Sequence, residues 1–343
     1  MRCGTGRPTE SHLPVGRDTY FAHDFPCAHR WVAEVKRVLV TGGAGFMGSQ
    51  IVRSLAAEGR DVVVLDKLTY AGRRAFLDGV AHEFIVADVC DAAAVRAALR
   101  GVDAVIHMAA ESHVARSLHT PDVFLQTNVV GTRVMLSEAA AAGIERFIHI
   151  STDEVFGSAP DGVAYTPDAT MAPGNAYAAS KVAGEALVHA WRHTHGFPAA
   201  IVRCTNNYGP RQHPEKAIPC WTLAGLTGKP LPVHGEGLAI RDWLHVEDFA
   251  RGVLKGLDHF RGDACWHLAG QSHRPNREMA DHIASILGAP GLEFGPERQG
   301  QDARYSLDDS ATRSELDWAP QVSIEEGLAQ TIEWYRTHRG LWD

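Results

Sequence analysis

The sequence has few of the features that mark secreted, membrane or metal-binding proteins. Its six cysteines are scattered without a CxxC pair, which fits a reducing compartment and predicts a cytoplasmic protein. No apolar run approaches the roughly 18 residues of a membrane span, so none is expected. The 19 histidines form no HExxH motif and no Cys/His pairing, so no metal site is predicted. The net charge of −8 argues against general nucleic-acid binding.

The chain is long enough for a large hydrophobic core and for more than one domain, with 343 residues. Residues 1–34 contain prolines and scattered Arg and His residues without helical or strand periodicity. They also lack the apolar core of a signal peptide, so we expect a disordered N-terminal extension. Beyond them, strand-type apolar runs alternate with helical patterns, which predicts an α/β fold with a doubly wound parallel sheet of the Rossmann type.

The first strand–helix unit carries a glycine-rich turn. A buried strand at 38–40 is followed by GAGFMG at 43–48 and then by a helical pattern. Such glycines allow a tight turn and close approach to a pyrophosphate, which the free N–H groups of the helix N-terminus can bind. A second strand, at 61–65, ends at Asp66, where an acceptor for a ribose 2′-hydroxyl is expected. Because a carboxylate would repel a 2′-phosphate, the sequence predicts NAD rather than NADP.

The segments that follow predict the remaining strands and helices of the fold. We expect strands at 84–87, 104–107, 147–150 and 200–203, and helices at 92–99, 121–142 and 175–195. After residue 210 the pattern is less periodic and rich in proline, which predicts a smaller C-terminal domain that binds the substrate. The predicted domains are 35–210 and 211–343, with a helix at 243–257 and a strand at 266–268 returning to the first domain within 241–270.

The most informative stretch is FIHISTDEVFG at 147–157, in which an apolar strand ends abruptly in polar residues. Open α/β sheets bind ligands at the carboxyl ends of their strands, where Asp153 and Glu154 would stand. Downstream, Tyr177 and Lys181 share one helix face, so we expect the lysine to lower the pKa of the phenol. Alone, each feature is more often a solvated loop or a surface pair. Together, behind a nucleotide-binding motif, they favour proton transfer around an oxidised alcohol.

The motifs together resemble those of the extended short-chain dehydrogenase/reductases and, within them, of the nucleotide-sugar 4,6-dehydratases. The resemblance spans Lys36 to about Tyr335. It rests on TGGAGFMGS (41–49), DKLTYAG (66–72), HMAAESHVARS (107–117), STDEVFG (151–157), YAASK (177–181), NNYGP (206–210), PEKAIP (214–219) and RDWLHVED (241–248). The Asp153–Glu154 pair is its most specific part, because related epimerases and decarboxylases differ there.

This resemblance implies an NAD-dependent lyase of deoxysugar biosynthesis. It would convert an NDP-hexose, with dTDP-glucose the expected substrate, into the 4-keto-6-deoxy sugar through transient oxidation at C4. The implied catalytic residues are Thr152, Asp153, Glu154, Tyr177 and Lys181. The implied NAD-binding residues are Gly42, Gly45, Phe46, Met47, Gly48, Asp66, Lys67, Leu68, Thr69, Asp88, Val89, Met108, Ala109, Ala110, Thr127, Tyr177, Lys181 and Asn207. The implied substrate-binding residues are Ser112, Thr152, Asn206, Lys216, Ala217, Pro232, Val233, His234, Arg241, Ser272, Arg298 and Gln301. The resemblance also implies a homodimer, formed through the helices that follow residues 121 and 175.

Three positions depart from the family pattern. Ala115 stands where the family has Asp, Ser272 where it has Asn, and Gln301 where it has His. The last two leave the nucleobase open, with dTDP-glucose favoured over a relaxed preference that admits UDP-glucose. Two other functions also stay open: an epimerase or decarboxylase of the same family, and a sensor that binds NAD without catalysis. The acid pair argues against the first, and the Tyr–Lys pair with its neighbouring threonine argues against the second.

Overall fold

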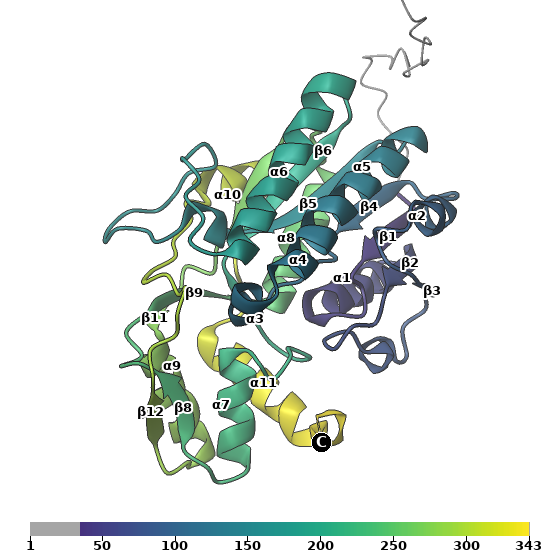
Figure 1. Ribbon diagram of the computed structural model, residues 1–343. Coiled ribbons are helices and arrows are strands. Elements are labelled where there is room, and N and C mark those ends of the chain that lie inside the picture. Colours follow the sequence, from purple (N-terminus) through teal and green to yellow (C-terminus); the bar gives the residue numbers. More distant parts are fainter. Residues whose placement is uncertain (1–34, 343) are drawn as a thin grey trace, which may run out of the picture. The chain divides into compact units, whose positions relative to one another are not determined.

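The computed structural model describes residues 35–342 and is built around a seven-stranded parallel sheet (Figure 1). Its strands are β1 (Arg37–Thr41), β2 (Asp61–Asp66), β3 (Glu83–Val86), β4 (Ala104–His107), β5 (Arg146–Thr152), β6 (Ala199–Cys204) and β10 (Cys265–Leu268). They lie in the order β10-β6-β5-β4-β1-β2-β3, so the direction of winding reverses between β4 and β1. This confirms the predicted Rossmann-type sheet. The extension predicted for residues 1–34 lies outside the described residues.

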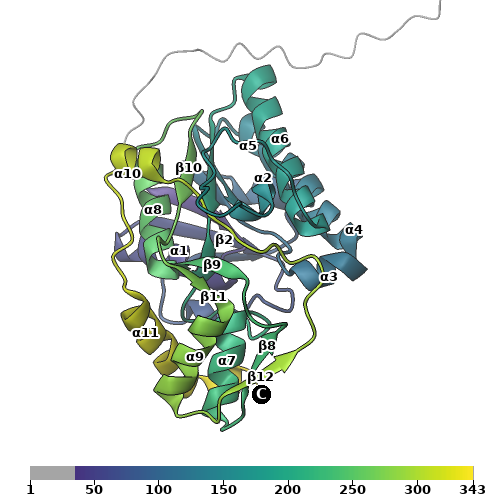
Figure 2. The same ribbon diagram turned by 90° about the vertical axis from the view of Figure 1, so that its left-hand side faces the viewer.

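Helices cover both faces of the sheet, because successive side chains of each strand point to opposite faces (Figure 2). In β1, Val38 and Val40 pack toward α1 (Phe46–Ala57) and α8 (Val246–Asp258). Leu39 packs on the opposite face, which is covered by the helices α2 (Ala92–Ala98), α5 (Thr132–Ala141) and α6 (Ala176–His195). Each such side chain contributes about 1.5–3 kcal/mol when fully buried. The apolar residues of the strands therefore form one core on each face of the sheet. The polar site lies at the carboxyl ends of the strands, outside these cores.

The helix predicted at 121–142 contains a π-helical segment. It starts as α4 (Pro121–Phe124), widens into the π-helix η2 (Leu125–Gly131) and continues as α5. The widened turn buries Asn128, whose amide group exchanges two hydrogen bonds with the backbone of Glu111, at 2.9 and 3.0 Å. Such π-helical turns occur frequently at functional sites. Here the turn braces the segment that follows β4.

Apart from α8, β10 and the helix at 310–316, the chain after residue 205 builds a smaller part at the carboxyl edge of the sheet. Its strands are β7 (Asn206–Tyr208), β8 (Leu231–His234), β9 (Ile240–His245), β11 (His273–Pro275) and β12 (Leu292–Gly295). Its helices are α7 (Ala217–Leu226), α9 (Asn276–Leu287) and α11 (Ile324–Thr337), which pack on a core that includes Trp221, Met279 and Leu328. Two further helices, α3 (Val114–His119) and α10 (Ser310–Leu316), lie against the larger part. The domain boundary predicted at 210/211 stays a prediction.

One predicted helix is wrong in its first turn. The segment 243–257 does not begin as a helix, because Trp243 to His245 are the end of β9, and α8 starts at Val246. Trp243 pairs in register with Asn206 of β7, so long-range strand pairing outweighs the local helical pattern. Strand β10 does return to the large sheet, beside β6. Among the described helices, none is long and apolar enough to cross a membrane.

Candidate active site

The polar end of β5 forms the centre of the site. After Thr152 the chain enters η3 (Asp153–Phe156), a short 3-10 turn at the carboxyl edge of the sheet. The Thr152 hydroxyl accepts a hydrogen bond from the Glu154 N–H at 3.3 Å and donates one to Asp153 Oδ1 at 3.1 Å. This one side chain therefore fixes the turn that presents both carboxyl groups.

Helix α6 supplies the second half of the site. Its cap is Asn175, whose Oδ1 accepts a hydrogen bond from Ala178 N–H at 2.9 Å and whose Nδ2 donates to Glu154 Oε2 at 3.4 Å. Further along, Lys181 Nζ donates to the carbonyl of Ile150 in β5 at 2.6 Å. These bonds hold the helix against the strand end. As a result, one pocket is lined by Thr152, Asp153, Glu154, Tyr177 and Lys181.

Burial dominates the ionisation of the tyrosine and the lysine. It raises the pKa of Tyr177 well above 10, and the Glu154 carboxylate adds to the rise. The net direction is opposite to the lowering expected from Lys181, because burial penalises the phenolate, and the Lys181 ammonium is hydrogen-bonded to the Ile150 carbonyl. Burial also lowers the pKa of Lys181 to about 8, against the opposing charge of Glu185. A phenolate at Tyr177 consequently requires further positive charge in the pocket.

The two carboxyl groups lie in different environments. Asp153 is 4% exposed, and burial raises its pKa well above 3.8, with the charge of Glu154 adding to the rise. Burial also raises the pKa of Glu154, but the Lys216 ammonium and the Asn175 amide lower it. The arrangement therefore favours Asp153 as a proton donor and Glu154 as a proton acceptor.

The glycine turn after β1 forms the opposite wall of the pocket. Gly42 has a left-handed φ of +71°, and a Cβ added there would lie 2.9 Å from the Ala109 backbone. A Cβ at Gly48 would lie 2.1 Å from the Gly42 carbonyl oxygen, so only glycine lets α1 start this close to the turn. The helix begins after Gly45 without a side-chain cap and without an acidic residue in its first turn. Its open N-terminus therefore fits a pyrophosphate.

Asp66, at the end of β2, has the geometry of an acceptor for a ribose hydroxyl. It is 8% exposed, and its carboxylate accepts backbone hydrogen bonds from Ala44 at 3.0 Å and Leu68 at 2.7 Å. A carboxylate has about four acceptor positions, so it can still bind a hydroxyl group, whereas it would repel a phosphate. All the predicted cofactor residues except Leu68 and Asp88 line the pocket. Asp88 pairs instead with Lys67 at 3.3 Å.

A second, smaller pocket adjoins the first and shares Glu154 with it. The predicted substrate residues that line both pockets are Asn206 and Lys216. Those that line only the first are Ser112 and Thr152. Those that line only the second are Ala217, Arg241, Arg298 and Gln301. Those outside both linings are Pro232, Val233, His234 and Ser272. Val233 lies in the core of the smaller part, and the Ser272 N–H donates to Asp242 at 2.7 Å, so the substrate roles of this last group stay predictions.

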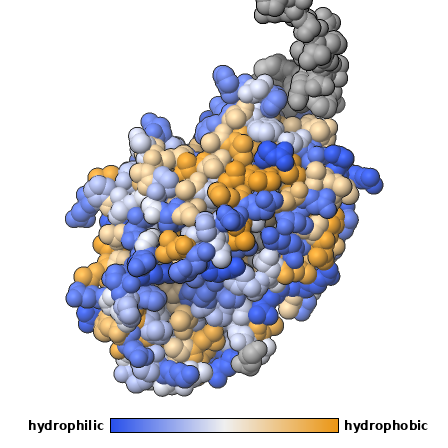
Figure 3. Space-filling view, viewed as in Figure 1, coloured by the Kyte–Doolittle hydropathy of each residue, from blue (hydrophilic) through white to orange (hydrophobic). Residues whose placement is uncertain are grey.

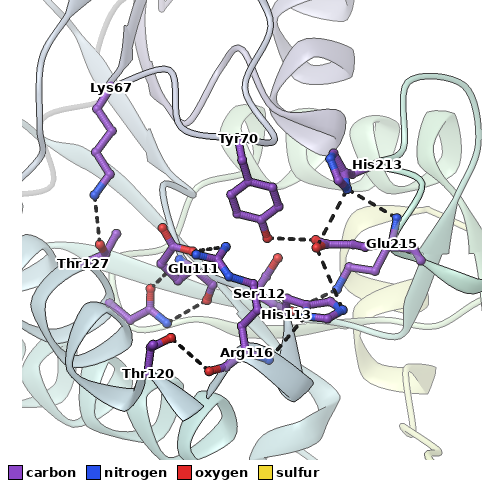
Figure 4. A network of polar contacts seen from close by, with 12 residues as sticks. Lys67, Tyr70, Glu111, Ser112, His113, Arg116, Thr120, Thr127, His213 and Glu215 are labelled. Atoms are coloured by element: carbon purple, nitrogen blue, oxygen red, sulfur yellow. Dashed lines mark hydrogen bonds and ion pairs between the residues drawn. The ribbon is translucent and has the colours of Figure 1, made fainter. Parts of the chain in front are cut away.

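The sequence did not predict the polar network that joins the segments around the pocket (Figure 4). The Tyr70 hydroxyl donates to Glu215 Oε1 at 2.8 Å, and the Arg116 guanidinium lies 4.2 Å from the centroid of the Tyr70 ring. Glu215 also faces His113 and His213, at 3.9 and 3.8 Å. The network thus links the loops that follow β2, β4 and β7. The only sequence signal for it is that its members lie in or beside the DKLTYAG, HVARS and PEKAIP motifs.

The fold and the pocket together define a class, that of enzymes which use a dinucleotide to oxidise an alcohol group of their substrate. Comparison with known proteins identifies the family within this class. The model of the NAD dependent epimerase/dehydratase family matches residues 38–276, and the chain belongs to that family. It is 43% identical to a dTDP-glucose 4,6-dehydratase of Streptomyces niveus, over 90% of this chain and 95% of that protein. It is 39% identical to the Escherichia coli dTDP-glucose 4,6-dehydratase, over 89% and 95%.

Solved structures agree with this placement. The crystal structure of a dTDP-glucose 4,6-dehydratase from Streptomyces venezuelae, with NAD and TYD bound, matches with a TM-score of 0.87 at 44% identity. The match covers 90% of this chain and 99% of that one. A Thermus thermophilus UDP-glucose 4-epimerase in complex with NAD matches with a TM-score of 0.82 at 30% identity, covering 88% and 99%. Dehydratases and epimerases therefore share this fold, and the residues of the site must distinguish them.

Proposed function

We propose that this chain is a dTDP-glucose 4,6-dehydratase, a hydro-lyase that holds NAD and forms dTDP-4-keto-6-deoxyglucose and water. The observation that carries the proposal is the position of Glu154, which lines both pockets next to the buried acid Asp153. Oxidation of an alcohol alone needs no such pair. A base and an acid at neighbouring positions are what the elimination of water across C5 and C6 of a hexose requires.

The first step oxidises C4 of the sugar. The glycine turn and Asp66 would hold NAD, which would supply a hydride acceptor for C4, positive charge in the pocket and, once reduced, a hydride donor for C6. Tyr177, as phenolate, takes the proton of the 4-hydroxyl group, which the Thr152 hydroxyl orients. Lys181, held by the Ile150 carbonyl, places its ammonium group in the same pocket. The 4-ketone that results makes the C5 proton acidic.

The second step removes water. Glu154 takes the C5 proton, and Asp153 gives its proton to the 6-hydroxyl group as the C6–O bond breaks. A C5–C6 double bond forms, and one hydride at C6 and one proton at C5 then saturate it. The sugar thus loses one water with no net oxidation. Each acid or base group of this kind accelerates its step by about 10²–10⁴-fold.

Analysis of the products tests the proposal. The purified protein is incubated in deuterated water with dTDP-, UDP-, CDP- and GDP-glucose, and the products are examined by mass spectrometry and NMR. We expect dTDP-glucose to lose one water and to gain one solvent deuterium at C5. A product of unchanged mass would indicate an epimerase, and bound NAD without turnover of any hexose would indicate a sensor. Either result would refute the proposal.

We also infer a homodimer. Three large apolar side chains on α3, α4 and η2 are exposed: Leu118 by 41%, Val123 by 41% and Leu125 by 50%. Figure 3 shows apolar residues gathered over the nearby region where α5 and α6 lie against each other. Such a patch is typical of a protein interface. Light scattering should report a dimer, and Leu125→Asp should yield a monomer of 37.2 kDa. A monomeric wild type would refute the inference. The cytoplasmic location stays a prediction.

A further inference from the structure

The last described residue, Trp342, packs beside the cofactor pocket. It follows η4 (Arg339–Leu341), and its ring is half-buried. The Arg73 guanidinium lies 4.6 Å from the centroid of the indole ring. The His213 ring meets it edge-on at 5.4 Å, and the Phe76 ring lies at 5.9 Å. One aromatic side chain therefore contacts two segments that are far apart in the sequence.

The first of these segments is tied to the glycine turn. The Arg73 N–H donates to the Ala44 carbonyl at 2.9 Å, inside that turn. Arg53 of α1 donates through Nε to the Phe76 carbonyl at 3.0 Å. The neighbouring residues 71–72 line the pocket themselves. Any displacement of this segment would therefore displace the wall that fits the pyrophosphate and the ribose.

The second segment forms the facing wall. His213 lines the pocket, and its ring meets the Tyr70 ring edge-on at 5.1 Å (Figure 4). The bond from the Tyr70 hydroxyl to Glu215 joins the two walls directly. The Tyr335 hydroxyl of α11 donates to the Gln212 carbonyl, so the C-terminal helix is anchored to the same segment. Trp342 thus contacts both walls, Arg73 and Phe76 on one side and His213 on the other.

We propose that the Trp342 side chain, by contacting both walls of the pocket, keeps them together and so slows the release of NAD. The inference rests on the assignment of NAD to this pocket. It suits the proposed reaction, because a cofactor restored in every cycle has no need to exchange. Release of NAD requires the walls to part, which separates Trp342 from either Arg73 or His213. Loss of one cation–π contact and one edge-to-face aromatic contact corresponds to roughly tenfold faster release.

The holoenzyme tests this directly. Protein loaded with radiolabelled NAD is chased with excess unlabelled NAD, and the label that stays bound is followed over time. Trp342→Ala should release NAD roughly tenfold faster than the wild type, and Trp342→Phe should stay close to it because a ring still faces Arg73. The fold should persist, since Trp342 lies outside the hydrophobic core clusters of the described chain. Turnover by diluted Trp342→Ala should fall and should return when NAD is added.

Phe294→Ala is the matched control. The Arg277 guanidinium lies 5.3 Å from the centroid of the Phe294 ring, so this ring also makes a cation–π contact. Phe294 is 49% exposed and lines neither pocket. This variant should release NAD at the wild-type rate. The proposal would be refuted if Trp342→Ala released NAD at the wild-type rate. It would also be refuted if this variant lost turnover that added NAD did not restore. A wild type that loads NAD but loses it as fast as Trp342→Ala would also overturn the proposal, whereas a wild type that cannot be loaded with NAD would overturn the cofactor assignment, so the two failures are distinguishable.

Discussion

Asn175 allows the stability of α6 to be separated from the basicity of Glu154. Its Oδ1 caps the helix at Ala178, and its Nδ2 donates to the Glu154 carboxylate at 3.4 Å. Asn175→Ser keeps a side-chain oxygen that is a good cap but removes the longer amide group that donates to the carboxylate. Asn175→Ala removes both. The two variants should therefore share one defect and differ in the other.

The magnitudes follow from the two contacts. A hydrogen bond to a charged group contributes about 1.5–3 kcal/mol, and 1.36 kcal/mol corresponds to one pKa unit. Because the bond to Glu154 is long, we place the effect of its loss at the low end of this range, and the loss should raise the pKa of Glu154. The Asn175 amide lowers this pKa, so removing it acts in the stated direction. Loss of the cap should cost about 1 kcal/mol of stability, and in Asn175→Ala only.

The assay is the pH dependence of kcat with deuterium incorporation at C5. Glu154 acts as a carboxylate, so a higher pKa protonates it at a higher pH and moves the acid limb of the profile upward. On that limb the rate should fall roughly tenfold in both variants, and the rates should converge with the wild type at higher pH. Melting should show the loss of stability in Asn175→Ala alone.

A helix cap elsewhere provides the control. Asp91 caps α2 by accepting hydrogen bonds from the N–H groups of Ala93 and Ala94, and it lines neither pocket. Asp91→Ala should lose about 1 kcal/mol of stability without moving the acid limb. An acid limb that stays in place in Asn175→Ser would refute the reasoning, because Glu154 would then not depend on the amide or would not be the base.

Three further predictions concern the base, the cofactor and the nucleotide. Glu154→Gln should still oxidise C4 but should incorporate no deuterium at C5 and release no water, as seen by NMR; normal turnover would show that another group is the base. Asp66→Ala should reduce the preference for NAD over NADP in equilibrium binding, and tighter binding of NADP by the wild type would contradict the role of Asp66. Because Ser272 lies outside both pocket linings, Ser272→Asn should leave the ratio of kcat/KM for dTDP- and UDP-glucose nearly unchanged. A ten- to hundredfold rise, the effect of a buried polar contact of about 1–3 kcal/mol, would support its predicted contact with the base.

Much of the fold could be predicted because it depends on local patterns. The strand at 104–107 has the predicted bounds, and the other predicted strands of the large sheet differ by a few residues at their ends. The prediction was wrong where long-range pairing decided the structure, as at Trp243, which pairs with Asn206 in a strand. The sequence analysis also did not predict the π-helical segment at 125–131, in which Asn128 is hydrogen-bonded to the backbone of Glu111, 17 residues away. A local pattern contains no information about such partners.

Local sequence patterns are enough to identify the groups available for chemistry and the edge of the sheet at which they stand. Asp66 ends a strand, the glycines at 43–48 and the Asp153–Glu154 pair each follow one, and parallel strands present their carboxyl ends at one edge. How these groups ionise, and which residues surround them, depends on the folded arrangement of the whole chain. The pKa of Tyr177 is raised by burial under segments from several parts of the chain, and the adjoining pockets that share Glu154 are lined in part by residues after 205. Desolvation depends on all the surrounding atoms, whatever their distance along the chain, so no motif could have predicted it.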